Sequence, residues 1–224
     1  MEDMTKDPLR AIGRLADPVR RRLYEIVSSR PQPTSREAAA EAAGIRRSLA
    51  AYHLDKLVAD GLLEASYART GERTGPGAGR TAKLYRRSDA EISASVPPRD
   101  YERAATLLAA ALEHEPTGAA RTALVDGAYR LGRESIDPGG EDADPLVNAL
   151  AATGYEPVCV EGHIRLRNCP FHHLAEGHRD LICGMNVSLV QGMIDALPGD
   201  ARTARLDRGR TGCCVAIATG DQKS

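Results

Sequence analysis

Four cysteines near the C-terminus are the side chains of this 224-residue chain best suited to redox or metal chemistry. They are Cys169, Cys183 and the adjacent pair Cys213 and Cys214, with 13 residues between the first two and 29 between Cys183 and Cys213. Thiolates bind zinc and iron–sulfur clusters, and they can be oxidised. The chain has no Cys-x-x-Cys motif, so a zinc ribbon is not indicated. Because buried free cysteine is an ordinary core residue, the spacing alone leaves core packing as open as metal binding.

Basic and polar residues on a helix form a second candidate site. The pattern predicts a helix over residues 45–57, with Leu54 and Leu57 facing the core. A short alanine-rich helix precedes it, beginning at a capping box of residues 34–37 and ending at Gly44. A short helix, a glycine turn and a basic helix in this order indicate a helix-turn-helix. The residues expected to face DNA are Arg46, Arg47, Ser48, Ala51, Tyr52 and Lys56.

The flanking segments predict a winged domain. An Asp17-Pro18 pair is typical of a helix start, and residues 62–68 and 81–85 are typical of two strands around a glycine-rich loop. Arg80 in that loop is expected to reach phosphate or the minor groove. Residues 1–87 hold 17 Lys and Arg against 11 Asp and Glu, a net charge of +6, whereas the remainder holds 13 against 20, a net charge of −7. A basic module joined to an acidic one favours nucleic-acid binding by the first.

The middle of the chain predicts a linker and two helices. Residues 93–100 are typical of a linker, and helices are predicted over residues 101–113 and about 117–136. The first of these helices has an apolar face made of Ala104, Leu107, Leu108, Ala111 and Leu112. This face can pack within its own subunit or against a second one. A dimer is favoured because it reads two half-sites of DNA.

The C-terminal segment predicts helices over residues 145–153 and 177–197, each followed by a hairpin. Cys169 then lies on a turn, Cys183 on a helix, and Cys213 or Cys214 on the last strand. The predicted fold is therefore α+β. It comprises a winged helix-turn-helix domain at residues 1–92, a linker with dimerisation helices at 93–143, and a cysteine-bearing α+β sensor domain at 144–224.

Three N-terminal motifs, Leu15–Leu23, Tyr52–Leu62 and the wing segment Gly79–Tyr85, resemble those of the ArsR-like winged-helix regulators. The wing is similar to a Gly-Arg-Pro…Tyr wing in the branch that includes the Suf-type iron–sulfur repressors, with Thr81 in place of the usual proline. Arsenic and zinc sensors of the wider family often carry cysteines on the recognition helix. The first cysteine here is Cys159, so that mode of sensing is disfavoured.

Three C-terminal segments, Arg167–Ala175, Leu181–Asn186 and Gly212–Ile217, are similar to the sensor half of the Suf-type repressors. The resemblance implies that Cys169, Cys183 and Cys213, with Cys214 as the alternative to Cys213, hold a [4Fe-4S] or [2Fe-2S] cluster. Cys159 lies outside this pattern and is expected in the core. A four-iron cluster usually takes four ligands, and the fourth is left open. Besides an exogenous ligand, the nearby donors are His172, His173, His178, Asp180 and Cys214, with each histidine expected at the surface.

Together these features predict a dimeric DNA-binding transcription regulator, a repressor by resemblance, whose binding to a double-stranded operator depends on the cluster. The alternative is a winged-helix regulator that senses zinc, thiol oxidation or a small apolar effector. An enzyme using Cys169 with His172 or His173 is not expected, because no orienting acid or oxyanion motif is recognisable. No apolar run approaches the ~20 residues of a membrane span, and the N-terminus lacks a signal-peptide stretch. We therefore expect a cytoplasmic protein without a membrane partner.

Overall fold

In the computed structural model the chain divides after Arg99 into two units, Met1–Arg99 and Asp100–Ser224. The structure describes residues 7–69, 81–137, 144–160, 163–207 and 212–218. Residues 93–100 contain no helix or strand, as the sequence predicts. The two helices that follow belong to the second unit, and their predicted role in dimerisation stays a prediction.

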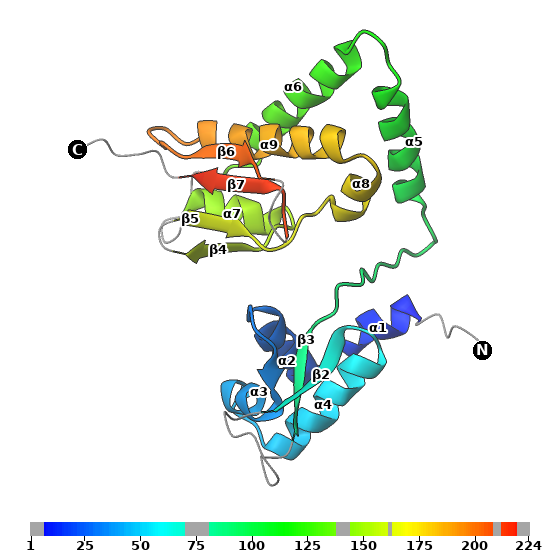
Figure 1. The fold of residues 1–224 in the computed structure, drawn as a ribbon, viewed down its shortest axis with the longest axis vertical. Helices are drawn as coiled ribbons and strands as arrows, with labels where there is room; N and C mark the ends of the chain where they lie inside the picture. The colour runs from blue at the N-terminus through cyan, green and yellow to red at the C-terminus, as the bar shows by residue number, and fades with distance from the viewer. Residues whose placement is uncertain (1–6, 70–80, 138–143, 161–162, 208–211, 219–224) are drawn as a thin grey trace. The chain divides into compact units, whose positions relative to one another are not determined.

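The first unit is a helical bundle with a three-stranded antiparallel sheet (Figure 1). Its described elements are α1 Pro8–Arg14, α2 Pro18–Ser28, β1 Thr34–Ser35, α3 Arg36–Ala43, α4 Arg47–Ala59, β2 Leu63–Arg69 and β3 Thr81–Arg87. The strand order is β1-β3-β2, and Tyr85 of β3 lies opposite both Thr34 and Ala65. The predicted helix-turn-helix and the two wing strands are confirmed. Helix α1 was not predicted.

Local sequence explains the helix starts of this unit. Asp17 Oδ1 accepts hydrogen bonds from the backbone N–H groups of Val19 at 2.9 Å and Arg20 at 3.0 Å, while Pro18 occupies the first turn. The capping box predicted at residues 34–37 is wrong in register. Ser35 caps α3 by accepting from Ala38 N at 3.2 Å, because Thr34 is held in β1.

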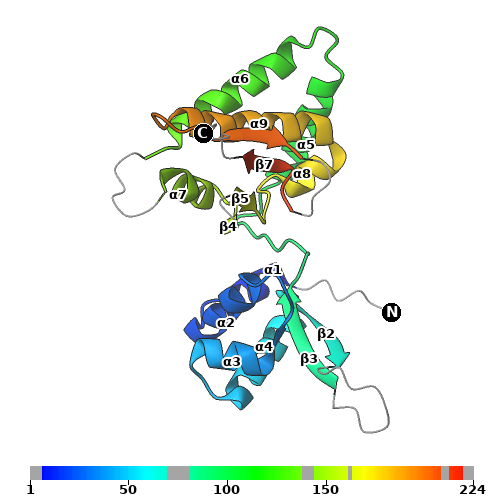
Figure 2. The ribbon, with the colours of Figure 1, turned by 60° about the vertical axis from the view of Figure 1, so that its left-hand side comes forward.

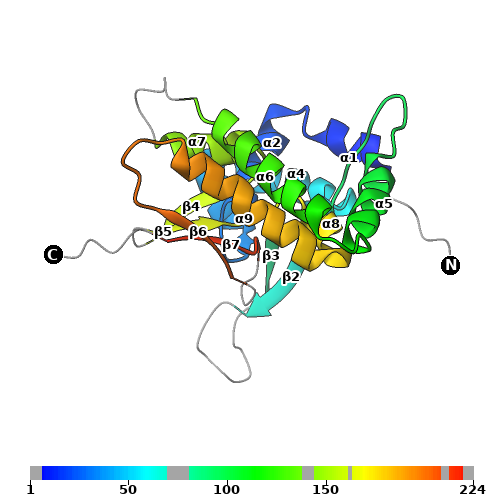
Figure 3. The same ribbon diagram turned by 90° about the horizontal axis from the view of Figure 1, so that it is seen from above.

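The second unit contains a four-stranded antiparallel sheet of order β4-β5-β7-β6, one long helix packed on this sheet and a second long helix packed on the first. Its described elements are α5 Tyr101–Glu113, α6 Ala119–Glu134, α7 Pro145–Ala152, β4 Pro157–Val160, β5 His163–Leu166, α8 His172–Gly177, α9 Arg179–Asp195, β6 Thr203–Leu206 and β7 Val215–Ala218. Helix α9 runs along the sheet, and α6 crosses the other side of α9 (Figures 2 and 3). The core between α9 and the sheet contains Leu150, Val190, Met193, Ile194 and Ile217.

Three details of the C-terminal prediction are corrected. The helix predicted over residues 177–197 begins at Arg179, because the non-helical backbone of His178, with φ −133° and ψ 47°, separates it from α8. Cys213 and Cys214 precede β7 instead of lying on it. Cys159 is exposed on β4, an edge strand, and is not a core residue.

Helix α5 buries a different side from the one that its apolar pattern suggests. Ala109 is buried against Leu181 and Ile182 of α9, with Leu112 packed beside them. Leu107 and Leu108 stay 67% and 66% exposed within one chain. No helix among the described residues has the length and apolar character that crossing a membrane requires.

Candidate functional site

A tight turn at Gly44 connects α3 to the recognition helix α4. This residue has φ +67°, and its left-handed backbone ends α3. The N–H of Ile45 donates to Ala40 O at 3.0 Å and closes the turn. Alanines on α3 face the core, so α4 crosses at short range and its buried side, Leu54 and Leu57, completes that core.

The opposite side of α4 carries the predicted DNA-facing residues. Arg46 at the helix N-cap, Arg47 and Ser48 are exposed, and Tyr52 is 58% exposed. Lys56 is half-buried, with its Nζ 5.8 Å from the centre of the Tyr52 ring. All five side chains are therefore at least partly accessible to solvent.

Two predicted positions need separate comment. Arg80 lies outside the described residues, so its contact with DNA stays a prediction. Ala51 is half-buried and lies at the edge of the exposed side. Arg47 is already paired with Glu37 of α3, Nη2 to Oε1 at 2.6 Å, and both side chains are largely exposed.

Two residues on α4 were not recognised from the sequence. Leu49 is 42% exposed beside Arg47 and Ser48, and an apolar side chain there can contact a thymine methyl group. Asp55 fastens the helix to the wing, because its Oδ1 accepts from Lys83 Nζ at 2.6 Å and from Tyr85 Oη at 2.9 Å. Burial acts to raise the pKa of Asp55, but the bonds from Lys83 and Tyr85 outweigh it, so the pKa lies below its usual value.

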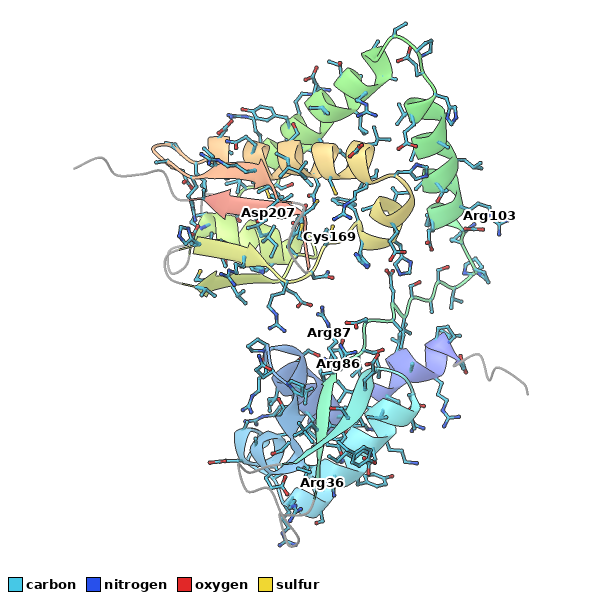
Figure 4. All side chains as sticks on the ribbon, viewed as in Figure 1. Arg36, Arg86, Arg87, Arg103, Cys169 and Asp207 are labelled. Atoms are coloured by element: carbon cyan, nitrogen blue, oxygen red, sulfur yellow. The ribbon has the colours of Figure 1, made fainter. Side chains whose placement is uncertain are left out.

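The second site is a group of four buried cysteines in the second unit, hereafter the cysteine group: Cys169, Cys183, Cys213 and Cys214. Cys169 lies in the loop between β5 and α8 (labelled in Figure 4), Cys183 on the first turns of α9, and the adjacent pair just before β7. Hydrogen bonds join Cys169 to Cys213, Cys213 to Cys214, and Cys214 to Cys183. The fold thus brings together all four thiols that the sequence singled out.

These contacts lower the pKa of two of the four thiols and raise the pKa of the other two. The hydrogen bond with Cys213 lowers the pKa of Cys169, and it lowers the pKa of Cys214 to about 6. The pKa of Cys213 is raised because its thiol is bonded to Cys169 and Cys214. Burial is the main cause that raises the pKa of Cys183 to about 12. Cys169 and Cys214 are therefore the thiols that ionise first, and ionised sulfur is the form that binds metals.

Backbone contacts hold the two cysteine-bearing loops. Cys213 N donates to Leu166 O at 3.2 Å, and His172 N donates to Cys169 O at 3.1 Å. Gly212 has φ +98°, and a Cβ there would lie 3.1 Å from Leu166 O, so glycine suits this position. The end of β5 is therefore adjacent to the loop of Cys169, which follows it in the chain, and to the loop of Cys213, which is hydrogen-bonded to it.

A buried amide also contacts the cysteine group. Asn186, one turn after Cys183 on α9, donates from Nδ2 to Cys213 Sγ at 3.4 Å and to Cys169 Sγ at 3.7 Å. Its Oδ1 accepts from the hydroxyl of Tyr155. The sequence showed an asparagine in the motif Leu181–Asn186 but gave no reason to place it beside the sulfurs.

Three of the other candidate ligands, the histidines, lie beside glutamates, and the fourth, Asp180, is exposed. His172 lies 3.5 Å from Glu176, His173 lies 3.4 Å from Glu102, and His178 Nδ1 lies 2.8 Å from Glu113 Oε2. His178 is only 12% exposed, so the expectation of a surface position is wrong for this histidine. Cys214 is therefore the fourth donor that the fold places with the other three.

Within the described ranges, no three Cys, His, Asp or Glu side chains are already grouped as ligands of one metal ion. A metal group bound by the four thiols would therefore require the loops carrying Cys169 and the Cys213–Cys214 pair to adjust. The chemistry of the donor set suits an iron–sulfur cluster, because the four donors are thiols, the site is buried and an amide donates to two of the sulfurs.

Comparison with known proteins identifies the N-terminal domain. Residues 15–65 match the family described as a helix-turn-helix domain. No curated protein matches the chain. A structure of human N-acetylserotonin methyltransferase in complex with SAM is 12% identical, with a TM-score of 0.23 over 90% of this chain and 49% of that chain. This chain spans about half the length of that structure, and a likeness at this score carries no argument about fold or activity. The helix-turn-helix domain indicates a DNA-binding transcription regulator.

Proposed function

We propose that this protein is a dimeric transcription repressor whose affinity for a double-stranded operator is controlled by an iron–sulfur cluster bound to its four buried cysteines. One observation carries the proposal. A chain with a helix-turn-helix domain also buries four thiols from three separate elements in one place. The similarity of the three cysteine segments to the Suf-type repressors supports the same function.

Cys169, Cys183, Cys213 and Cys214 would hold the cluster, and the cluster would supply a site that responds to iron supply and oxidants. The chain's own part is to provide thiolates. Cys169 and Cys214 already have lowered pKa values, and Asn186 donates hydrogen bonds to two of the sulfurs. The buried core around them limits access of water and chelators.

A packed route links the cysteine group to α5, the first helix after the linker. Phe171, two residues after Cys169, packs against the core around the cysteines and also against the small cluster of Ala109, Leu181 and Ile182. His178 at the start of α9 pairs with Glu113 at the end of α5. Movement of the Cys169 loop would therefore change how α5 is held, and α5 leads to the DNA-binding unit.

The exposed leucines of α5 support the dimer. Leu107 and Leu108 lie on the predicted apolar face and remain largely exposed in one chain. A dimer formed through this face would carry two recognition helices, which is the number that reading both half-sites of a palindromic operator requires. A bound state that favours one arrangement of the two copies would then change operator affinity.

Thiol oxidation is a second candidate function, and the hydrogen-bonded pairs of thiols favour it. Cys169 with Cys213, and Cys183 with Cys214, are neighbours in which one member has a lowered pKa. Iron and acid-labile sulfide analysis of protein purified without oxygen decides between the two functions. The cluster predicts both elements and visible absorbance. Colourless protein without iron, which cannot be reconstituted, would leave thiol oxidation as the means of sensing.

A further inference from the structure

Asn186 has a polar side chain at a buried position, where a polar group without hydrogen-bond partners would destabilise the fold. It is fully buried, at 0% exposure, on the side of α9 that faces the core containing the cysteine group. Burying an amide is unfavourable unless its hydrogen bonds are replaced inside the protein. The partners of this amide therefore show what the position is used for.

Both the nitrogen and the oxygen of the Asn186 amide have hydrogen-bond partners. An asparagine amide nitrogen carries two N–H donors, and here that nitrogen donates to the sulfur of Cys213 at 3.4 Å and to that of Cys169 at 3.7 Å. The amide oxygen accepts from the Tyr155 hydroxyl. Burial raises the pKa of Tyr155 far above its usual value, so the phenol stays protonated and can donate. Tyr155 thus fixes which end of the amide faces the sulfurs.

The orientation has a chemical consequence. A neutral thiol is a weak acceptor, whereas hydrogen bonds to a charged acceptor are about twice as strong as neutral ones. Two donors aimed at two sulfurs are therefore best used when those sulfurs carry negative charge. Metal-binding cysteines are in that state, and hydrogen bonds to their sulfurs tune the bound group.

We propose that Asn186 is a positioning residue that holds the sulfurs of Cys169 and Cys213 in place through hydrogen bonds from its amide nitrogen, with Tyr155 fixing the direction of that amide. The inference rests on the proposed function for what those sulfurs bind. It adds a residue, outside the cysteines, that positions their sulfur atoms.

The first test uses the full chain, freed of iron and fully reduced, with iodoacetamide as probe and peptide mass spectrometry to follow each cysteine. Asn186→Leu keeps the branching and the number of heavy atoms of the side chain and removes both donors. We expect alkylation of Cys169, the member of the pair with the lowered pKa, to slow by about threefold, because a tenfold smaller thiolate fraction is partly offset by the higher nucleophilicity of the remaining thiolate. The exposed Cys159 should react at an unchanged rate in the same sample.

This readout separates positioning from mere packing. A residue that only fills the core would loosen it when replaced, and the buried thiols would then react faster. Asn168→Leu is the matched control, because Asn168 precedes Cys169 but its amide donates to Gly154 O at 2.7 Å. A rate for Cys169 that is unchanged or faster in Asn186→Leu would overturn the inference.

The second test uses the iron-loaded full chain and measures its reduction potential. Donors to sulfur stabilise the reduced, more negative state, so Asn186→Leu should lower the potential by about 59 mV, a tenfold change for one electron. Tyr155→Phe, which leaves both donors but frees the amide, should give a smaller shift in the same direction. An unchanged potential in Asn186→Leu would overturn the inference. A wild-type protein that holds no iron would refute the proposed function, while the alkylation rates would still decide the role of Asn186.

Discussion

Gly132 of α6 and Gly192 of α9 bring the backbones of the two helices into contact. A Cβ on Gly132 would lie 2.0 Å from Leu189 O, and a Cβ on Gly192 would lie 2.1 Å from Tyr129 O. Neither distance is possible for real atoms, so only glycine fits at both places. Helix α9 also carries Cys183 and Asn186. The close crossing therefore fixes where these two residues lie along the axis of α6.

Replacing Gly192 with alanine should therefore destabilise the second unit. The added methyl group meets a backbone carbonyl that cannot rotate away, so we expect a loss of about 3 kcal/mol, at the upper end of the cost of overpacking. Gly127→Ala on α6 is the control, because its Cβ would have only the end of the Arg130 side chain nearby, at 3.9 Å. That change should stabilise by about 0.5–1 kcal/mol. Urea unfolding followed by circular dichroism measures both, and equal stabilities would contradict the close crossing.

The exposed side of α4 should supply phosphate contacts. Arg46→Ala combined with Arg47→Ala should weaken binding to all DNA sequences, and each lost contact should reduce the slope of log K against log salt by about 1. Titration of labelled DNA at several salt concentrations measures the slope. Unchanged affinity in the double variant would mean that another surface binds DNA.

Glu37→Gln should change DNA affinity in the opposite direction, and it therefore serves as a control for the same surface. The change removes the partner of Arg47 and leaves the cation free to reach phosphate. DNA affinity should rise by a few fold at low salt, and the gain should shrink as salt increases. A decrease in affinity would show that Glu37 contributes to binding in some other way.

Asp55 should make the link between recognition helix and wing sensitive to acid. Its folded-state pKa lies below the reference value of 3.8, so the stabilisation is present above pH 3.8 and is lost as the pH falls through the folded pKa. Half of the side chain is exposed, which keeps the effect below about 1 kcal/mol. Asp55→Asn should unfold more easily than wild type at pH 7 and almost equally at pH 2.5. A difference that persists at pH 2.5 would rule out the carboxylate as its cause.

The leucines of α5 should hold two copies together. Leu107→Lys with Leu108→Lys should shift the protein from dimer to monomer in sedimentation velocity at micromolar concentration, because charges would be buried at the interface. Leu9→Glu on α1, where Leu9 is 58% exposed, is the control for a charge on another exposed leucine. A wild-type protein that is monomeric under these conditions would refute the predicted interface.

The first unit could be predicted largely from its sequence because its signals are local. A proline after an aspartate, a glycine at a positive φ and an alternating strand each act within a few residues. Helix α1 was missed although Asp7 and Pro8 give a similar start. Its helix is short, and part of its anchoring comes from distant Asp60, which pairs with Arg14 at 2.7 Å and Arg10 at 3.2 Å.

The site in the second unit depends on packing over long sequence separations, which explains what was missed. The resemblance identified the cysteines, but no local pattern places Asn186 between Cys169 and Cys213 or gives Tyr155 its role. The intramolecular contact of α5 was also not predicted, because it is made by Ala109, which lies outside the predicted apolar face, with Leu112 beside it, while Leu107 and Leu108 stay exposed.

The measurement that tests the central claim most directly is operator affinity with and without iron, under anaerobic conditions. The DNA is a fragment selected by the protein from a random library, and dissociation constants are compared for iron-loaded protein and for the same protein after chelation. We predict at least a tenfold difference, equal to about 1.4 kcal/mol of coupling. The difference should be abolished in Cys169→Ser and kept in Cys159→Ser, where the thiol is exposed and apart from the group. Equal dissociation constants for the iron-loaded and iron-free wild-type protein would contradict control of DNA binding by a cluster.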